Sequence, residues 1–78
     1  MSRQTKRQLA DALQMLGRQI KSIREVLKLS QFDFAKVCGL DQAQLSRIEA
    51  GKVNLTLSTL LQIANASKLS LDIQFSEL

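Results

Sequence analysis

The hydrophobic residues in the first third of the chain recur at alternating steps of four and three. This spacing is typical of a helix that buries one stripe of its surface, and it predicts a helix over Arg3–Leu27. Gly17 interrupts the stretch at a cost of roughly 1 kcal/mol relative to alanine, so the pattern leaves open a kink or a break there. The stripe consists of Leu9, Leu13, Leu16, Ile20, Ile23 and Leu27.

Two shorter helical patterns follow and meet across a single glycine, Gly39. Ser30 is placed to cap the first of these helices, with Asp33 completing a capping-box-like pair, and Gly39 ends it. Asp41 caps the second helix and Gly51 closes it. The apolar positions face inward from two helices that cross at a steep angle, which predicts a helix-turn-helix. These positions are Phe34, Cys38, Leu40, Leu45 and Ile48, with Ala35 where the helices cross.

The segment after the second helix of the motif has no apolar period and is predicted to be a loop, over residues 52–56. Thr56 then caps a further helix, Leu57–Ala66, whose apolar stripe closes the core. The predicted stripe consists of Leu57, Leu60, Leu61 and Ala64, with Ile63 at its margin.

The apolar period changes from 3.6 to about 2 in the tail, Leu69–Leu78, which indicates a strand. A lone strand leaves its backbone groups unpaired, so it needs a partner strand from outside the protomer. The simplest partner is the same segment of a second copy, running antiparallel in a homodimer. A frayed end or a last helical turn is the alternative. The residues expected to be buried by dimerisation are Leu69, Leu71, Ile73 and Phe75.

These elements together predict an all-α fold of four to five helices, with one C-terminal β-strand that pairs across a dimer. We expect a single domain over residues 1–78, divided into a helical extension (1–15), a core (16–66) and a dimerisation strand (67–78). Leu9 and Leu13 lie in the extension, and they must pack against the domain itself, a second copy or another protein.

Eleven Lys and Arg against seven Asp and Glu give a net charge of +4 and an isoelectric point of 9.7. This balance favours an anionic partner without identifying it. Most of the basic residues precede the motif, where only Asp11 and Glu25 oppose them, so part of that surface is expected to meet phosphates. They are Arg3, Lys6, Arg7, Arg18, Lys21, Arg24 and Lys28.

The chain has one cysteine, Cys38, and no histidine. This composition gives no disulfide and no metal site, and no catalytic constellation or glycine-rich phosphate loop is found. We therefore expect a protein that is not an enzyme and that has no cofactor, with Cys38 in the core. No apolar run approaches the length of a membrane span, so a soluble cytoplasmic protein is expected.

Short motifs in the helix-turn-helix and its flanks carry a resemblance to a known family. They are Leu29-Ser30-Gln31, Phe34-Ala35, Cys38-Gly39-Leu40, Leu45-Ser46-Arg47-Ile48-Glu49, Gly51-Lys52, Thr56-Leu57 and Leu60-Leu61-Ile63-Ala64. Over Leu16–Ala66 the chain resembles the lambda-repressor-like, or XRE-type, helix-turn-helix family. Two features depart from that family: its first helix normally begins near Leu16, and it commonly has glycine where this chain has Lys28, a position that often needs a positive φ.

The outward face of the second helix of the motif is predicted to contact base edges. Gln42 is suited to a bidentate pair with adenine, Ala43 to contact with a thymine methyl group, and Arg47 to guanine. Gln44 and Ser46 share this face and are further candidates. The alternative for the two glutamines is an ordinary solvated helix surface.

Contacts with the DNA backbone are predicted on both sides of the recognition helix. Ser30 and Gln31 lie at a helix N-terminus suited to phosphate. Lys52 and the N–H groups of Val53 and Asn54 lie just past the recognition helix. The resemblance also implies that Gln31 braces the first glutamine of the recognition helix.

The resemblance assigns Arg24 and Glu49 to a salt bridge that ties the first helix to the recognition helix. Both residues are present in this chain. We therefore assign them to structure and not to DNA binding.

The leading interpretation is a homodimeric, sequence-specific repressor of transcription that binds double-stranded DNA. The tail resembles that of HipB-type antitoxins, in which a terminal strand pairs in the dimer, and this favours an antitoxin-like autoregulator of a toxin–antitoxin operon with a HipA-like kinase as toxin partner. One alternative is a phage-type stand-alone repressor. Another is a protein-interaction module that docks a partner through Leu9 and Leu13 without specific DNA binding.

Overall fold

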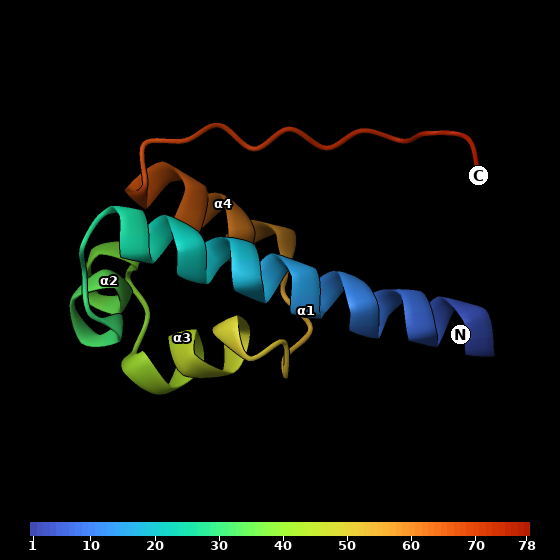
Figure 1. Cartoon of the computed structure of the whole chain (residues 1–78), viewed down its shortest axis with the longest axis horizontal. Helices are drawn as coiled ribbons and strands as arrows, with labels where there is room; N and C mark the ends of the chain where they lie inside the picture. Colours follow the sequence, from blue (N-terminus) through green and yellow to red (C-terminus); the bar gives the residue numbers. More distant parts are fainter.

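The computed structural model describes all 78 residues and contains four helices and no strand (Figure 1). The helices are α1 (Arg3–Val26), α2 (Gln31–Cys38), α3 (Gln42–Glu49) and α4 (Leu57–Ala66). In Figure 1, α1 runs between α3 on one side and α4 with the C-terminal tail on the other. These bounds confirm the helices that the sequence pattern predicts, and α1 continues through Gly17 without a break.

Each helix begins at a polar cap, as the sequence predicts for the last three. The side-chain oxygens of Ser2, Ser30, Asp41 and Thr56 each accept the backbone N–H of the residue three positions on. Such caps contribute about 1 kcal/mol each. The pair predicted at the start of α2 is only half formed, because Asp33 donates its N–H to Ser30 and its carboxylate makes no return bond.

The core is built where α2, α3 and α4 meet under α1. Phe34, Leu45 and Ile63 are 0, 0 and 2% exposed, and burying a side chain of this size stabilises the fold by roughly 1.5–3 kcal/mol. The full buried cluster consists of Ile20, Phe34, Ala35, Cys38, Leu45, Ile48 and Ile63. Cys38 therefore lies in the core, and burial raises the pKa of its thiol.

The predicted apolar stripe of α4 is only partly correct: Leu60 packs against the buried cluster as predicted, but two members of the stripe do not. Ile63, predicted at the margin of the stripe, is at its centre, while Leu57 and Leu61 remain 57% and 42% exposed. Ser67, just past the helix, is also buried, and its hydroxyl donates to the carbonyl oxygen of Ile63 at 2.8 Å. The apolar surface of α4 is wider than the face that the protomer can cover, and periodicity does not show which edge stays outside.

The turn after α1 has a residue in the left-handed region. Lys28 adopts φ of 59°, so this turn keeps the conformation for which the family commonly uses glycine, at a strain on the order of 1 kcal/mol.

Leu9 and Leu13, in the N-terminal part of α1, are both half-buried within the protomer. The close approach of α1 to the rest of the domain begins at Gln14, whose Cα would lie 2.8 Å from a Cβ on Gly51.

The predicted strand over residues 69–78 does not form in the protomer. Beyond Leu69, whose N–H donates to the Ala64 carbonyl oxygen, no backbone group of the tail bonds to another backbone group. The tail instead extends beside α4 (Figure 1), and Phe75 is fully exposed. The alternating pattern predicted an extended chain correctly, but a strand also needs a ladder partner and the protomer has no second extended segment to supply one.

Candidate nucleic-acid interface

The exposed face of α3 is the first component of the site. Leu45 and Ile48 point into the core, at 0% and 4% exposure, and this fixes the rotation of the helix. The five residues predicted to contact bases are consequently all exposed on the remaining surface of α3: Gln42, Ala43, Gln44, Ser46 and Arg47. A short helix that presents small and polar side chains fits the major groove of DNA.

Gln44 is held in place before any partner arrives. Its N–H donates to the Asp41 carboxylate at 2.7 Å, and its side-chain oxygen accepts the Asp41 N–H at 3.0 Å, which completes a capping box. Only the side-chain NH₂ of Gln44 is left to bond outward. Gln44 can therefore act as a donor to a base or phosphate, but not as the bidentate adenine partner that a free glutamine provides.

An ion pair fastens α1 to the end of α3. Arg24 Nε donates to Glu49 Oε2 at 2.7 Å and Arg24 Nη2 donates to Oε1 at 3.1 Å, which is a bidentate geometry. The third donor, Nη1, bonds to the Leu29 carbonyl oxygen at 3.0 Å. The hydrogen bond with Glu49 raises the pKa of Arg24 above its ordinary value. Both predicted partners are thus used for architecture, with side chains 14% and 4% exposed.

Gln31 joins this network, and the resemblance misplaced its bracing contact. Its side-chain Nε2 donates to Glu49 Oε1 at 3.0 Å, so it braces the carboxylate and not Gln42. Glu49 Oε1 accepts hydrogen bonds from both Arg24 and Gln31, and the side-chain NH₂ of Gln31 is therefore directed toward α3. The side-chain oxygen of Gln31 is left unbonded. Ser30, the neighbouring cap, is exposed at the N-terminus of α2, as predicted.

The loop after α3 supplies free backbone donors. The N–H of Lys52 is used, because it bonds to the Arg47 carbonyl oxygen at 2.9 Å. The N–H groups of Val53 and Asn54 bond to no protein atom, and all three residues are exposed. Two adjacent unpaired N–H groups beside an exposed lysine are a suitable arrangement for a phosphate oxygen.

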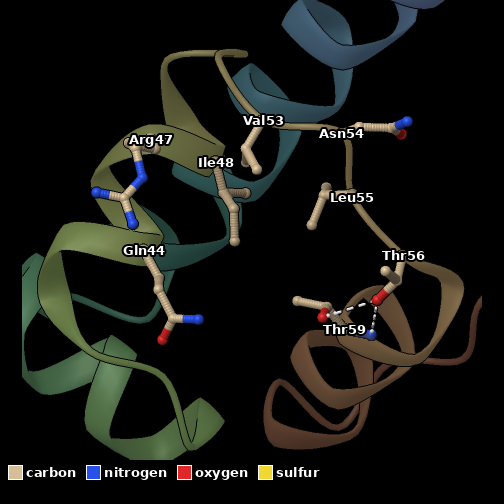
Figure 2. Close-up of a pocket in the computed structure, with 8 residues that line it drawn as sticks. All are labelled: Gln44, Arg47, Ile48, Val53, Asn54, Leu55, Thr56 and Thr59. Atoms are coloured by element: carbon tan, nitrogen blue, oxygen red, sulfur yellow. Dashed lines mark hydrogen bonds between the residues drawn. The ribbon is translucent and has the colours of Figure 1, made fainter.

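A shallow cleft of about 230 Å³ separates α3 from this loop and the start of α4. Figure 2 shows Gln44 and Arg47 on one wall and Thr56 and Thr59 on the other, with Asn54 pointing outward at the rim. Thr56 accepts the Thr59 N–H at 3.2 Å and donates its hydroxyl to Thr59 at 2.9 Å. Thr59 lines this cleft but is absent from the residues that the sequence predicts for the site, although a second hydroxyl in the first turn of the helix after the predicted phosphate-contacting loop is a usable signal.

Other kinds of site find little support in the structure. No group of three or more His, Cys, Asp or Glu side chains is arranged to hold a metal ion. None of the four helices is long and apolar enough to span a membrane.

An exposed polar recognition helix, packed on a second helix at a steep turn and flanked by free backbone donors, defines a helix-turn-helix DNA-binding regulator. The chain belongs to the helix-turn-helix family, whose profile matches residues 20–74. The two expectations that the resemblance raised for this region, the fold and the class, are confirmed.

Two relatives are named as controllers. The chain is 34% identical to the control protein C.SmaI of Serratia marcescens over 56 residues, which cover 72% of this chain and 67% of the relative. It superposes on the crystal structure of the restriction-modification controller protein C.AhdI from Aeromonas hydrophila with a TM-score of 0.75 and 28% identity, covering 78% of this chain and 88% of the other. Neither is described as an antitoxin, so the likeness of the tail to HipB-type proteins gains no support.

Proposed function

We propose that the protein is a sequence-specific transcriptional regulator that binds double-stranded DNA as a homodimer and represses by occupying an operator. The observation that carries the proposal is the outward face of α3, which is held at both ends before DNA is bound. The capping box holds its start, and the Arg24–Glu49 pair holds its end. A recognition helix ordered in advance loses less conformational entropy on binding.

Within this proposal, two residues of α3 read bases directly. Gln42 has no side-chain partner within the protein and pairs with adenine, and Arg47, one turn further on, reaches guanine. Ala43 contacts a thymine methyl group. Gln44 and Ser46 make single hydrogen bonds to a base or a neighbouring phosphate.

Phosphate contacts on both sides set the register of α3 on the duplex. The free N–H groups of Val53 and Asn54, with Lys52, hold one phosphate group. Ser30 and Gln31 lie at the N-terminus of α2, whose backbone N–H groups hold a phosphate on the other strand.

A second copy of the chain covers the apolar surface that the protomer leaves open. Leu57 and Leu61 of α4 are exposed, and so are Ile73 and Phe75 of the tail, which extends beside α4 (Figure 1). Large apolar side chains that the protomer leaves exposed are candidates for an interface. A symmetric pair of such surfaces gives a two-fold dimer, whose recognition helices then meet half-sites about one helical turn apart.

The likeness to the restriction-modification controller protein C.AhdI favours restriction-modification genes as the regulated target. A helix-turn-helix domain of this kind serves equally well in an antitoxin or a phage-type repressor, so the target rests on the relatives and not on the site. Transcription of neighbouring endonuclease and methyltransferase genes should respond to the protein. Stable co-purification with a neighbouring kinase, and no such genes nearby, would instead support the toxin–antitoxin assignment.

An interaction module without DNA binding is disfavoured by the packing of α1. Leu9 and Leu13, the residues that would dock a partner, are half-buried within the protomer and expose only part of their apolar surface.

The test is a selection of duplexes from a pool of randomised sequence, followed by titration of the enriched duplex. We expect two related half-sites about one turn apart, an affinity roughly 10³-fold or more above random duplex, and a steep loss of affinity with salt. Equal affinity for selected and random duplex would overturn sequence-specific binding.

A further inference from the structure

The N-terminal part of α1 carries a basic surface that the helix-turn-helix itself does not use. Arg3, Lys6 and Arg7 are all exposed, and none takes part in an ion pair. The first turn of α1 contains no acidic residue. Positive charges at the positive end of a helix dipole oppose its stability, so this arrangement is unfavourable for the isolated helix and favourable only beside an anion.

The face of α1 that carries these charges is fixed by two close contacts further along the helix. A Cβ on Gly51 would lie 2.8 Å from Gln14 Cα, and buried Gly17 lies directly on the end of α3. At 100° per residue, positions seven or eleven apart share a helix face within about 20°. Arg3 and Arg7 lie eleven and seven residues before Gln14, and Lys6 lies eleven before Gly17. All three charges therefore lie on the side of α1 that meets α3 and its following loop.

The same face continues toward the recognition helix. Lys21, seven residues after Gln14, lines a hollow together with Ser46 of α3 and Ala50, the residue that follows α3. In Figure 1 the loop after α3 passes behind α1 on its way to α4, and the N-terminal end of α1 runs on past this loop. With a rise of about 1.5 Å per residue, Arg3 lies roughly 16 Å beyond Gln14.

We propose that this surface, Arg3, Lys6 and Arg7, binds the phosphate backbone of the duplex just outside the half-site that α3 reads. The inference rests on the proposed DNA binding and extends it: the loop after α3 holds one phosphate, and the helix that passes this loop carries three cations outward along the flanking duplex. These contacts carry no sequence information, so they raise affinity for any flank.

The experiment uses the full chain and the duplex selected above, prepared with flanks of 0, 5 and 10 base pairs. The wild type is compared with the triple variant Arg3→Gln/Lys6→Gln/Arg7→Gln, in which glutamine keeps helix propensity high. The control, Lys36→Gln/Lys68→Gln, removes two exposed lysines from the last turn of α2 and from the end of α4. Circular dichroism checks that the variants remain helical.

We expect the wild type to bind the long duplex roughly tenfold more tightly than the trimmed one, and the triple variant to bind both alike. The slope of log affinity against log salt should fall by about 0.9 for each phosphate that is no longer neutralised, with no fall in the control. Equal wild-type affinity for all flank lengths would overturn the inference and point to an acidic protein as the partner of this surface. Loss of sequence preference would overturn the proposed function itself, whereas absence of the flank effect with intact preference overturns only this inference.

Discussion

A Cβ atom at position 17 would lie 2.5 Å from the backbone carbonyl oxygen of Glu49 and 2.6 Å from that of Ile48. Gly17 thus allows α1 to lie directly on the last turn of α3. Seven residues further along α1, Arg24 binds the carboxylate of the same Glu49. The end of the recognition helix is therefore held by α1 at its backbone and at its side chain.

Gly17→Ala should lower the free energy of unfolding by about 1–3 kcal/mol, because the obstructing atoms are backbone and cannot rotate away. The substitution gains roughly 1 kcal/mol of helix propensity, so a loss of stability would isolate the steric effect. Gln19→Ala, at an exposed position of the same helix, should change stability by less than about 0.5 kcal/mol. Urea denaturation measures the free energy of unfolding of both variants. If Gly17→Ala stabilises the protein instead, α1 and α3 can move apart at position 17 without a steric cost.

Arg24→Met should destabilise the fold by roughly 3–5 kcal/mol, because it leaves the buried Glu49 carboxylate with Gln31 as its only side-chain partner. The double variant Arg24→Met/Glu49→Leu removes both charges and should recover much of this loss. A double-mutant cycle in urea gives the coupling energy. Additive effects of the two single changes would mean that the pair is not coupled in solution.

Stability should decline as the pH rises above 9.0, the ordinary pKa of a cysteine thiol. Burial raises the pKa of Cys38 in the folded state, so the unfolded chain loses its proton first and is favoured between the two pKa values. The contribution of the protonated Cys38 thiol to the stability of the folded state is fully present below pH 9.0, and it is lost as the pH rises through the folded-state pKa. Comparison with Cys38→Val isolates it: the wild type should lose more stability than the variant over this range, and parallel pH profiles would contradict the prediction.

Arg47→Ala and Lys52→Ala should weaken DNA binding in different ways. Loss of a base contact at Arg47 costs roughly 1–3 kcal/mol and relaxes preference at one base pair. Loss of a phosphate contact at Lys52 weakens all duplexes alike and lowers the salt slope by about 0.9. Titrations against single-base variants of the selected duplex distinguish the two, and a uniform loss for Arg47→Ala would reassign that residue to the backbone.

Ile73→Ser/Phe75→Ser should convert the dimer to monomer at micromolar concentration while the protomer remains folded, because both side chains are exposed in the protomer, at 60% and 100%. Sedimentation equilibrium measures the mass, and circular dichroism checks the fold. The control is Ser76→Ala, which lies in the same tail and should leave the dimer intact. Gln62→Ser in α4 would be an unsuitable control, because the side-chain amide of Gln62 donates to the Cys38 carbonyl oxygen. A variant that stays dimeric would move the interface away from the tail.

The period and the caps of the chain were enough to predict four to five helices, of which four form, together with their approximate bounds and the exposed face of α3. This works because amphipathic spacing and capping are local properties, set by residues three and four apart. The predicted core face of α4 was wrong at Leu57 and Leu61, which are exposed, and at Ile63, which is buried, because Ile63 and Leu61 both fit the apolar period. Only packing against α1 and α2 decides which of them is buried.

By itself, then, the sequence determined the helix-turn-helix, the set of side chains on the recognition helix and the net positive charge. The tertiary structure alone decided that Gln31 braces Glu49, that Gly17 of α1 lies on the end of α3, and that Arg3, Lys6 and Arg7 lie on the side of α1 that meets α3. These relationships join residues whose distance in space depends on how helices rotate and cross. Rotation and crossing follow from close packing of whole surfaces, which no local pattern contains.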